Sequence, residues 1–268
     1  MKKYFKLGLV ALLFAFVFIA FTANTSANAE ANGSLSADLD SDGTEEVVVW
    51  EFDEDSCIVT ALTINGTDVY KATKTEPLRT PYDFRVKVID TCTKDKYKEV
   101  VVELFEDTVW FAIFRYDNGK ITKYLDDDDF TGYEIISQKK KNRICTSDYL
   151  YVTNIGNIFT NISYNIKSGK AKMVKGQTFK ATKQNYTTSF KSTAEMTVYK
   201  KDNCKTAKGI LKKGEKFTLL KFKEDKSGRN TLVYIKTKSG VKGWINTEEF
   251  ESNDEDYPFL VENAPIFG

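Results

Sequence analysis

The chain has 268 residues, with 39 basic side chains, 38 acidic side chains and no histidine. The missing histidine excludes Ser-His-Asp and Cys-His catalysis and every metal centre that relies on histidine ligands. Carboxylate chemistry of the glycosidase kind stays open, because a pair of acidic side chains is enough for it.

Residues 1–29 predict a secretory signal peptide. Three lysines in the first six residues precede an apolar run over residues 7–21, and Ala27-Asn28-Ala29 offers a cleavage site between small residues. The run is shorter than the ~20 residues of a membrane-spanning helix, so we expect no stable membrane insertion after cleavage. A retained membrane anchor is the alternative.

An acidic loop comes next, directly ahead of a β-branched strand. Three aspartates alternate along it, and a glycine after the third permits a sharp turn. Calcium takes six to eight oxygen ligands at about 2.3–2.6 Å, which alternating carboxylates and a backbone carbonyl can provide. An EF-hand is excluded, because its twelfth loop position would be Val49 and its flanking helices are missing. The predicted Ca²⁺ ligands are Asp38, Asp40, Asp42, the Thr44 carbonyl and Glu46.

Part of this pattern recurs further along the chain. Residues 46–49 (Glu-Val-Val-Val) reappear at 99–102, and Asn65-Gly66 reappears as Asn118-Gly119, both at an offset of 53 residues. The acidic loop that enters a valine strand resembles the calcium loop of integrin-type propeller repeats, also called FG-GAP or VCBS repeats. That resemblance implies blade-like units that bury their faces against one another.

Alternating apolar residues and Asn-Gly turns predict the strands of two repeats. In the first repeat we expect strands over 47–52 and 57–64 and a third ending at 69–70. In the second we expect them over 84–90, 99–105, 108–116 and 121–124. The loop at 90–99 keeps an acid at either end but carries lysines in place of the other carboxylates, so we interpret it as a calcium loop that no longer binds.

A third, fainter unit spans about residues 133–179, with Lys167-Ser168-Gly169-Lys170 in the place of the Asn-Gly turn. Three blades do not close a ring of the usual four to eight. The predicted repeat domain, residues 30–185, is therefore either an open propeller-like array or a compact sandwich of the same hairpins.

Net charge divides the chain after the signal peptide into two halves. Residues 30–130 hold 24 acids and 11 bases, whereas residues 131–268 hold 14 acids and 25 bases. The acidic half suits calcium and the basic half suits an anionic polymer such as a cell wall. The runs at 126–129 (four aspartates) and 139–141 (three lysines) are interpreted as solvated turns.

Export permits disulfides, and the chain has four cysteines: Cys57, Cys92, Cys145 and Cys204. They can pair in three ways or stay unpaired.

In residues 190–251 the sequence pattern changes, and it predicts short strands with turns at Gly214, Gly228 and Gly240. The motifs Leu-Lys-Lys-Gly-Glu at 211–215 and Gly-Val-Lys-Gly-Trp-Ile at 240–245 make this stretch resemble the bacterial Src-homology-3 (SH3-like) domain, a small barrel. The resemblance implies binding to peptidoglycan or to wall-associated peptides, although the Asn-x-Arg motif common on the first strand is missing. Our candidates for an aromatic ligand groove are Tyr199, Tyr234 and Trp244, the last of which can alternatively serve the core.

Together these patterns predict an all-β, exported and non-enzymatic protein that is secreted and associated with the cell wall. A propeller-like array of antiparallel repeats is followed by the SH3-like barrel, and residues 252–268 form a C-terminal tail that packs back. We expect peptidoglycan or wall-associated peptide as partner and no nucleic acid. The alternatives are a carboxylate-based cell-wall hydrolase, or an accessory domain to one, and an extracellular protein–protein interaction module.

Overall fold

The computed structural model describes residues 32–80, 82–106, 109–125, 130–182, 188–250 and 259–266. Within these ranges the chain is all-β apart from one short α-helix and one 3-10 turn, which confirms the predicted fold class at this level. No helix in the described part is long and apolar enough to cross a membrane. The expected signal peptide and the aspartate run at 126–129 lie outside the described residues.

The first sheet is a four-stranded antiparallel meander in chain order. A short helix, α2 (Val69–Thr73), follows its last strand. The strands are β1 (Asn32–Ala37), β2 (Glu46–Asp53), β3 (Ile58–Ile64) and β4 (Thr67–Asp68).

The second sheet repeats this order, and a short fifth strand pairs with β7. Its strands are β5 (Asp83–Ile89), β6 (Glu99–Phe105), β7 (Val109–Asp117), β8 (Lys120–Leu125) and β9 (Thr131–Gly132). The two Glu-Val-Val-Val motifs therefore open the second strand of their respective sheets.

The third sheet is again a four-stranded meander. Two of its strands are long and form a hairpin of ten paired positions. Its strands are β10 (Glu134–Ile136), β11 (Arg143–Val152), β12 (Gly156–Lys167) and β13 (Lys170–Met173).

The fourth sheet has seven strands in the order β14-β18-β19-β20-β16-β17, with β15 also paired to β18. A 3-10 turn, η1 (Thr247–Glu249), follows its last strand. The strands are β14 (Thr178–Lys180), β15 (Ser189–Lys191), β16 (Met196–Tyr199), β17 (Ala207–Leu211), β18 (Lys216–Glu224), β19 (Asn230–Thr237) and β20 (Lys242–Asn246).

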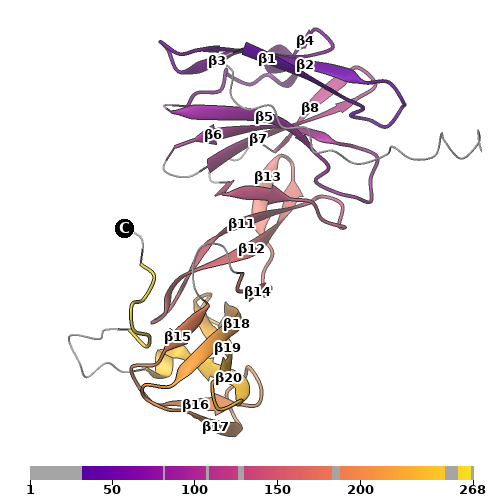
Figure 1. Ribbon diagram of the computed structural model, residues 1–268. Helices are drawn as coiled ribbons and strands as arrows, with labels where there is room; N and C mark the ends of the chain where they lie inside the picture. The colour runs from indigo at the N-terminus through magenta and orange to yellow at the C-terminus, as the bar shows by residue number, and fades with distance from the viewer. Residues whose placement is uncertain are drawn as a thin grey trace, which may run out of the picture.

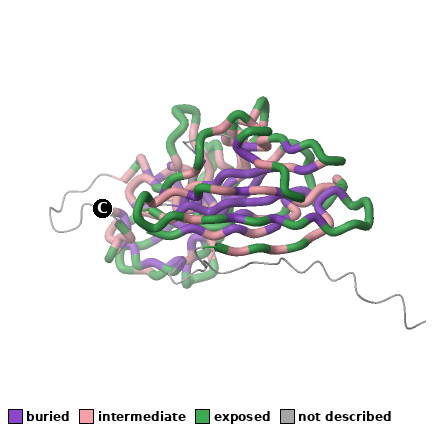
Figure 2. Tube along the Cα trace, turned by 90° about the horizontal axis from the view of Figure 1, so that it is seen from above, coloured by how far each residue is buried: buried purple, intermediate pink, exposed green. Residues whose placement is uncertain are grey.

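The first three sheets stack on one another along the long axis of the molecule (Figure 1). Strand β6 lies in the middle of the stack and is buried on both faces, which explains its uninterrupted valine run. Val100 and Val102 pack in the core shared with the first sheet, whereas Val101 packs in the core shared with the third. Seen from above, buried residues concentrate along the strands and exposed residues in the connecting loops (Figure 2).

The β11–β12 hairpin joins the stack to the fourth sheet. Near one end Ile144 belongs to the core shared with the second sheet, while Ile158 and Ile162 belong to a core with Phe179 and Phe222 of the fourth. The described part of the C-terminal tail, residues 259–266, completes this last core with Leu260 and Val261, which are 0% and 2% exposed. One hydrophobic core thus takes residues from both sides of the 185–190 boundary.

Candidate functional site

The acidic loop connects β1 to β2 at one edge of the first sheet. The two strands pair as far as Ala37 and Glu46, so residues 38–45 form the hairpin connection. Two of its residues, Ser41 and Gly43, have positive φ, at 58° and 90°. Side chains within the loop bind its own backbone: the Gly43 N–H donates to Asp38 Oδ2 over 3.2 Å, and the Thr44 N–H donates to Asp42 Oδ1 over 2.7 Å.

The loop gathers three carboxylates. Asp38, Asp40 and Asp42 each offer an oxygen, and these oxygens all lie within 4.8 Å of one another. Two ligands on opposite sides of a calcium ion, each at about 2.4 Å, would be about 4.8 Å apart, so this spread fits one coordination shell. Asp38 Oδ1 and Asp40 Oδ1 are both buried and have no hydrogen-bond partner among the described residues, and Asp40 is 1% exposed. Buried carboxylate oxygens normally have a partner, so this pair is arranged as a cation ligand set would be.

The loop also docks on the second sheet. Asp40 Oδ2 accepts a 2.8 Å hydrogen bond from the N–H of Asn118, in the turn between β7 and β8. The Lys98 N–H donates to the Leu39 carbonyl over 2.8 Å, and Ser41 Oγ donates to the Lys96 carbonyl over 2.6 Å. The Asp40 carboxylate therefore belongs to the cluster of aspartates and also binds the second sheet through Oδ2.

Glu46 lies beside this cluster rather than in it. It is 2% exposed, and its Oε2 accepts a 2.8 Å hydrogen bond from the Leu39 N–H. Burial raises the pKa of its carboxyl, the Leu39 hydrogen bond opposes that shift, and the charges of Asp40, Asp42 and Asp38 raise it further. Thr44 is exposed. The structure thus brings three predicted ligands together and places Glu46 within electrostatic reach of them.

The corresponding loop of the second sheet, residues 90–98, lies against a cationic side chain of the neighbouring strand β7. The Thr91 N–H donates to Glu99 Oε2 over 3.1 Å, which matches the bond from Leu39 to Glu46. Arg115 on β7 donates from Nε to Glu99 Oε1 over 2.9 Å and pairs with Asp95 at 3.5 Å. Burial lowers the pKa of Arg115, but the two carboxylates outweigh this effect and raise it.

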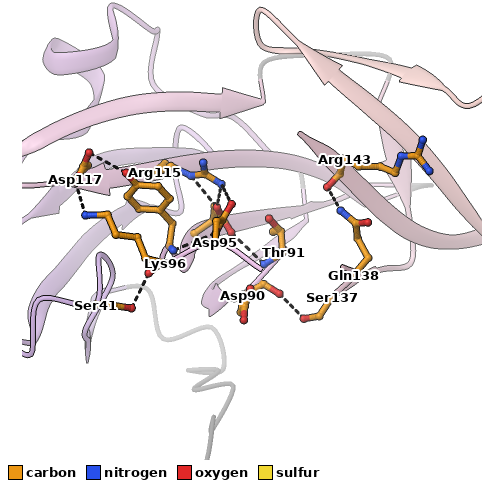
Figure 3. A network of polar contacts seen from close by, with 12 residues as sticks. Ser41, Asp90, Thr91, Asp95, Lys96, Arg115, Asp117, Ser137, Gln138 and Arg143 are labelled. Atoms are coloured by element: carbon orange, nitrogen blue, oxygen red, sulfur yellow. Dashed lines mark hydrogen bonds and ion pairs between the residues drawn. The ribbon is translucent and has the colours of Figure 1, made fainter. Parts of the chain in front are cut away.

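A third loop, residues 137–142, continues the row formed by the first two. Ser137 Oγ donates to the Asp90 carbonyl, and the Gln138 N–H donates to the Thr91 carbonyl over 3.2 Å. The bond between Ser137 and Asp90 appears in Figure 3, where Arg115 lies between Asp117 and Asp95. The three loops touch in sequence order, and their character changes from acidic, through a charge-paired loop, to the exposed lysines at 139–141.

The predicted aromatic residues meet on the outer face of the fourth sheet. Tyr234 pairs across the strands with Trp244, which pairs with Tyr199, and the Tyr234 and Trp244 rings are 5.2 Å apart. Trp244 is 8% exposed because lysine side chains cover it: Lys221 Nζ lies 5.2 Å and Lys223 Nζ 5.8 Å from its ring centre. The structure brings all three together, on the face opposite the core residues Val233 and Ile245.

A cysteine and two acids border this aromatic face. The Tyr199 hydroxyl donates to Glu249 over 2.9 Å, and Lys223 pairs with Asp202. Burial and the nearby Glu249 and Asp202 raise the pKa of the Cys204 thiol to about 11. The thiol is therefore protonated at neutral pH and is a poor nucleophile. None of the four cysteines, all of which are described, is in a disulfide.

Sequence reasoning missed two residues of the loop row. Arg115 was detectable as the single basic residue in a largely apolar and aromatic strand, where a buried cation needs an acidic partner. Asn118 was recognised as a turn residue, but the bond from its N–H to Asp40 depends on how the two sheets stack.

No family model, no curated protein and no solved structure matches this chain.

Proposed function

We propose that the chain is an exported, non-enzymatic cell-surface protein whose β-repeat domain is stabilised by one calcium ion. The carrying observation is the pair of buried, unpartnered oxygens on Asp38 and Asp40, next to the Asp42 carboxylate. Asp38, Asp40, Asp42, the Thr44 carbonyl and Glu46 would hold the ion. A divalent cation there would offset the repulsion among these acids.

The arrangement of the first three sheets supports their interpretation as propeller-like repeats. Each is an antiparallel meander that packs its faces on its neighbours, and the three connecting loops between first and second strands lie in one row. In the second repeat the guanidinium of Arg115 sits between Glu99 and Asp95, where it supplies positive charge that a metal ion would otherwise bring. That arrangement supports the interpretation of this loop as one that no longer binds calcium.

Thermal unfolding of the mature protein in excess calcium and in chelator tests the metal. With free calcium at about 100 times its Kd, binding contributes about 2.7 kcal/mol, which corresponds to a rise in Tm of roughly 5–10 °C. Asp40→Asn should abolish the rise. Asp55→Asn, a change in an exposed acid of the β2–β3 turn, should preserve it. Equal melting points of the wild type in both buffers would refute calcium binding.

The second part of the proposal is that the fourth sheet is an SH3-like module that binds peptidoglycan or a wall-associated peptide. Tyr199, Tyr234 and Trp244 form its aromatic surface. Lys221 lies over the Tyr234 and Trp244 rings, and Lys223 lies over the Trp244 ring. Aromatic faces bordered by charged side chains suit ligands that combine apolar and polar groups.

A sedimentation assay on purified sacculi tests this binding with the full mature chain. Tyr234→Ala should weaken it at least fivefold, because the variant removes the half-buried ring of the Tyr234–Trp244 pair without touching the core. Tyr151→Ala is the matched control, since Tyr151 is an exposed tyrosine on the third sheet, 50% accessible. Equal retention of both variants would refute the aromatic surface. Zymography on the same sacculi covers the rival function: a clearing zone that disappears in an acid-to-alanine variant would establish a hydrolase.

A further inference from the structure

A hollow of about 330 Å³ lies on the outer face of the fourth sheet, over β15, β18 and β19, which are adjacent in Figure 1. Three lysines and three hydroxyl residues are among those that line it. The lining side chains used below are Ser189, Lys216, Thr218, Lys236 and Lys238. We call this set the lysine hollow.

The strand register places these side chains on one face. Ser189 pairs with Thr218, and Thr218 pairs with Lys236, so the three form a row across three strands. Lys216 is two residues before Thr218 and Lys238 is two residues after Lys236, and the Lys238 N–H donates to the Lys216 carbonyl over 2.8 Å. Residues two apart on a strand share a face, so Ser189, Lys216, Thr218 and Lys236 face away from the core. Lys238, directly after β19, is exposed.

The charge of the lysine hollow is unbalanced. Among the described residues, none of Lys216, Lys236 and Lys238 has an ion-pair partner. The nearest acid in sequence, Glu215, accepts hydrogen bonds from the N–H groups of Lys212 and Ser239, over 3.2 and 3.0 Å, and its one negative charge only partly offsets the three ammonium groups. Three ammonium groups gathered round one depression raise the local positive potential, which attracts anions.

We infer that the lysine hollow binds the phosphate groups of a linear polyanion. Lysine is a common phosphate ligand that acts as a point charge, and the hydroxyls of Ser189 and Thr218 add donors for phosphate oxygens. A single phosphate at an exposed site gains little, whereas a polymer presents one anion after another to the same three lysines. The aromatic residue of the lining, Phe217, is 1% exposed and offers no ring face for stacking a base. These observations favour a phosphate polymer without bases over a nucleic acid.

This site shares no residue with Tyr199, Tyr234 and Trp244, so it stands or fails separately from wall binding at the aromatic face. The probe is fluorescently labelled inorganic polyphosphate, titrated with the full mature chain and followed by anisotropy. Buffers contain no divalent cation, because polyphosphate itself binds calcium. Orthophosphate, poly-L-glutamate and single-stranded DNA of matched charge are the competitors.

The test variant replaces Lys216, Lys236 and Lys238 by Gln together, and the matched control replaces Lys167, Lys170 and Lys172 at the β12–β13 turn, with the same change in net charge. We expect the test variant to bind polyphosphate at least tenfold more weakly and the control less than threefold. Removing three phosphate contacts should also reduce the slope of log Kd against log salt by about 2, at ~0.7 per contact on a flexible strand. Lys→Arg at the same three positions should retain binding, which separates lost charge from lost folding.

Equal weakening by the two triple variants would overturn the site and leave only a net-charge effect. Displacement by poly-L-glutamate or by single-stranded DNA at a lower concentration than by unlabelled polyphosphate would overturn the ligand class. Displacement by orthophosphate at equal phosphate concentration would overturn the need for a polymer.

Discussion

Buried carboxylates determine the chemistry of the row of loops at residues 38–45, 90–98 and 137–142. Different neighbouring residues oppose or balance the negative charge of each carboxylate. Glu46 lies beside three aspartates, so its charge is opposed by its neighbours as well as by burial. Glu99 occupies the matching place in the second sheet, with Arg115 against it. The rings of Tyr97 and Tyr124 flank that guanidinium, at 4.6 and 4.3 Å. In the proposed function the first loop takes an external cation, whereas in the second Arg115 supplies the positive charge.

Removal of Arg115 should expose this dependence. We expect Arg115→Ala to lower the free energy of unfolding by about 3 kcal/mol at pH 7, because the Glu99 side chain, 0% exposed, is left charged and unpaired. Burial raises the pKa of Glu99, so the folded variant takes up a proton there more readily than the unfolded chain. The loss should therefore be greatest, and constant, above that raised pKa, and should shrink as pH falls from it toward the lower pKa of the unfolded chain.

Urea unfolding at pH 7 and pH 4.5 measures both effects. Arg85→Ala is the matched control: Arg85 contacts Glu103 at 3.6 Å, but Glu103 keeps Lys87 as a partner. The control should cost less than about 1 kcal/mol at either pH, as expected for a partly exposed ion pair. Similar losses in the two variants would contradict a special role for Arg115.

At the scale of elements, the turns were the most predictable feature. Asn65-Gly66, Asn118-Gly119 and Ser168-Gly169 all have positive φ at both residues, and each joins the third and fourth strands of its sheet. Two-residue hairpin turns need such backbone angles, and the two residues of the turn are enough to predict it. The strands predicted at 47–52, 99–105 and 121–124 are confirmed for the same reason, since their patterns are local.

The prediction failed where a cap overrode strand propensity. Val69 and Tyr70 favour a strand, yet they begin helix α2. The Asp68 side chain accepts a hydrogen bond from the Lys71 N–H over 3.1 Å and so caps the first turn. Asp68 was visible in the sequence, but a single capping residue ahead of a five-residue helix is a weak signal. The short strands β13, β14 and β15 lacked a pattern long enough to read.

The start of β12 depends on a close approach by the C-terminal segment. Gly156 has φ of 111°, and a Cβ there would lie 2.6 Å from the Pro265 carbonyl oxygen. The Asn157 N–H donates to the same oxygen over 2.6 Å. We expect Gly156→Ala to cost at least about 2 kcal/mol from backbone strain and this clash, and to speed protease cleavage within residues 259–266. Gly176→Ala, also at positive φ (66°) but in open space, should cost about 1 kcal/mol and leave the cleavage rate unchanged. Equal cleavage in both variants would contradict the contact.

At the scale of the whole molecule, three hydrophobic cores run from the first sheet to the fourth without a break. One joins the first two sheets, the next joins the second and third, and the last joins the third to the fourth. Sequence periodicity predicted which residues turn inward, but not which sheets share a core. The stacked rings of Phe179 and Phe222, 5.1 Å apart, come from positions 43 residues apart, a pairing that no local pattern reveals.

The shared last core sets the smallest fragment that folds. A chain limited to residues 191–250 contains the two SH3-like motifs but lacks Ile158, Phe179 and Leu260, which are 3%, 1% and 0% exposed in the intact protein. Burial of side chains of this size contributes about 1.5–3 kcal/mol each, comparable with the whole stability of a domain this small. We therefore expect this fragment to show no cooperative unfolding in urea by near-ultraviolet circular dichroism. A fragment of residues 133–268, which retains the β11–β12 hairpin and the C-terminal segment, should unfold cooperatively. A sharp transition in the short fragment, with the same midpoint as the long one, would show instead that the fourth sheet is stable by itself.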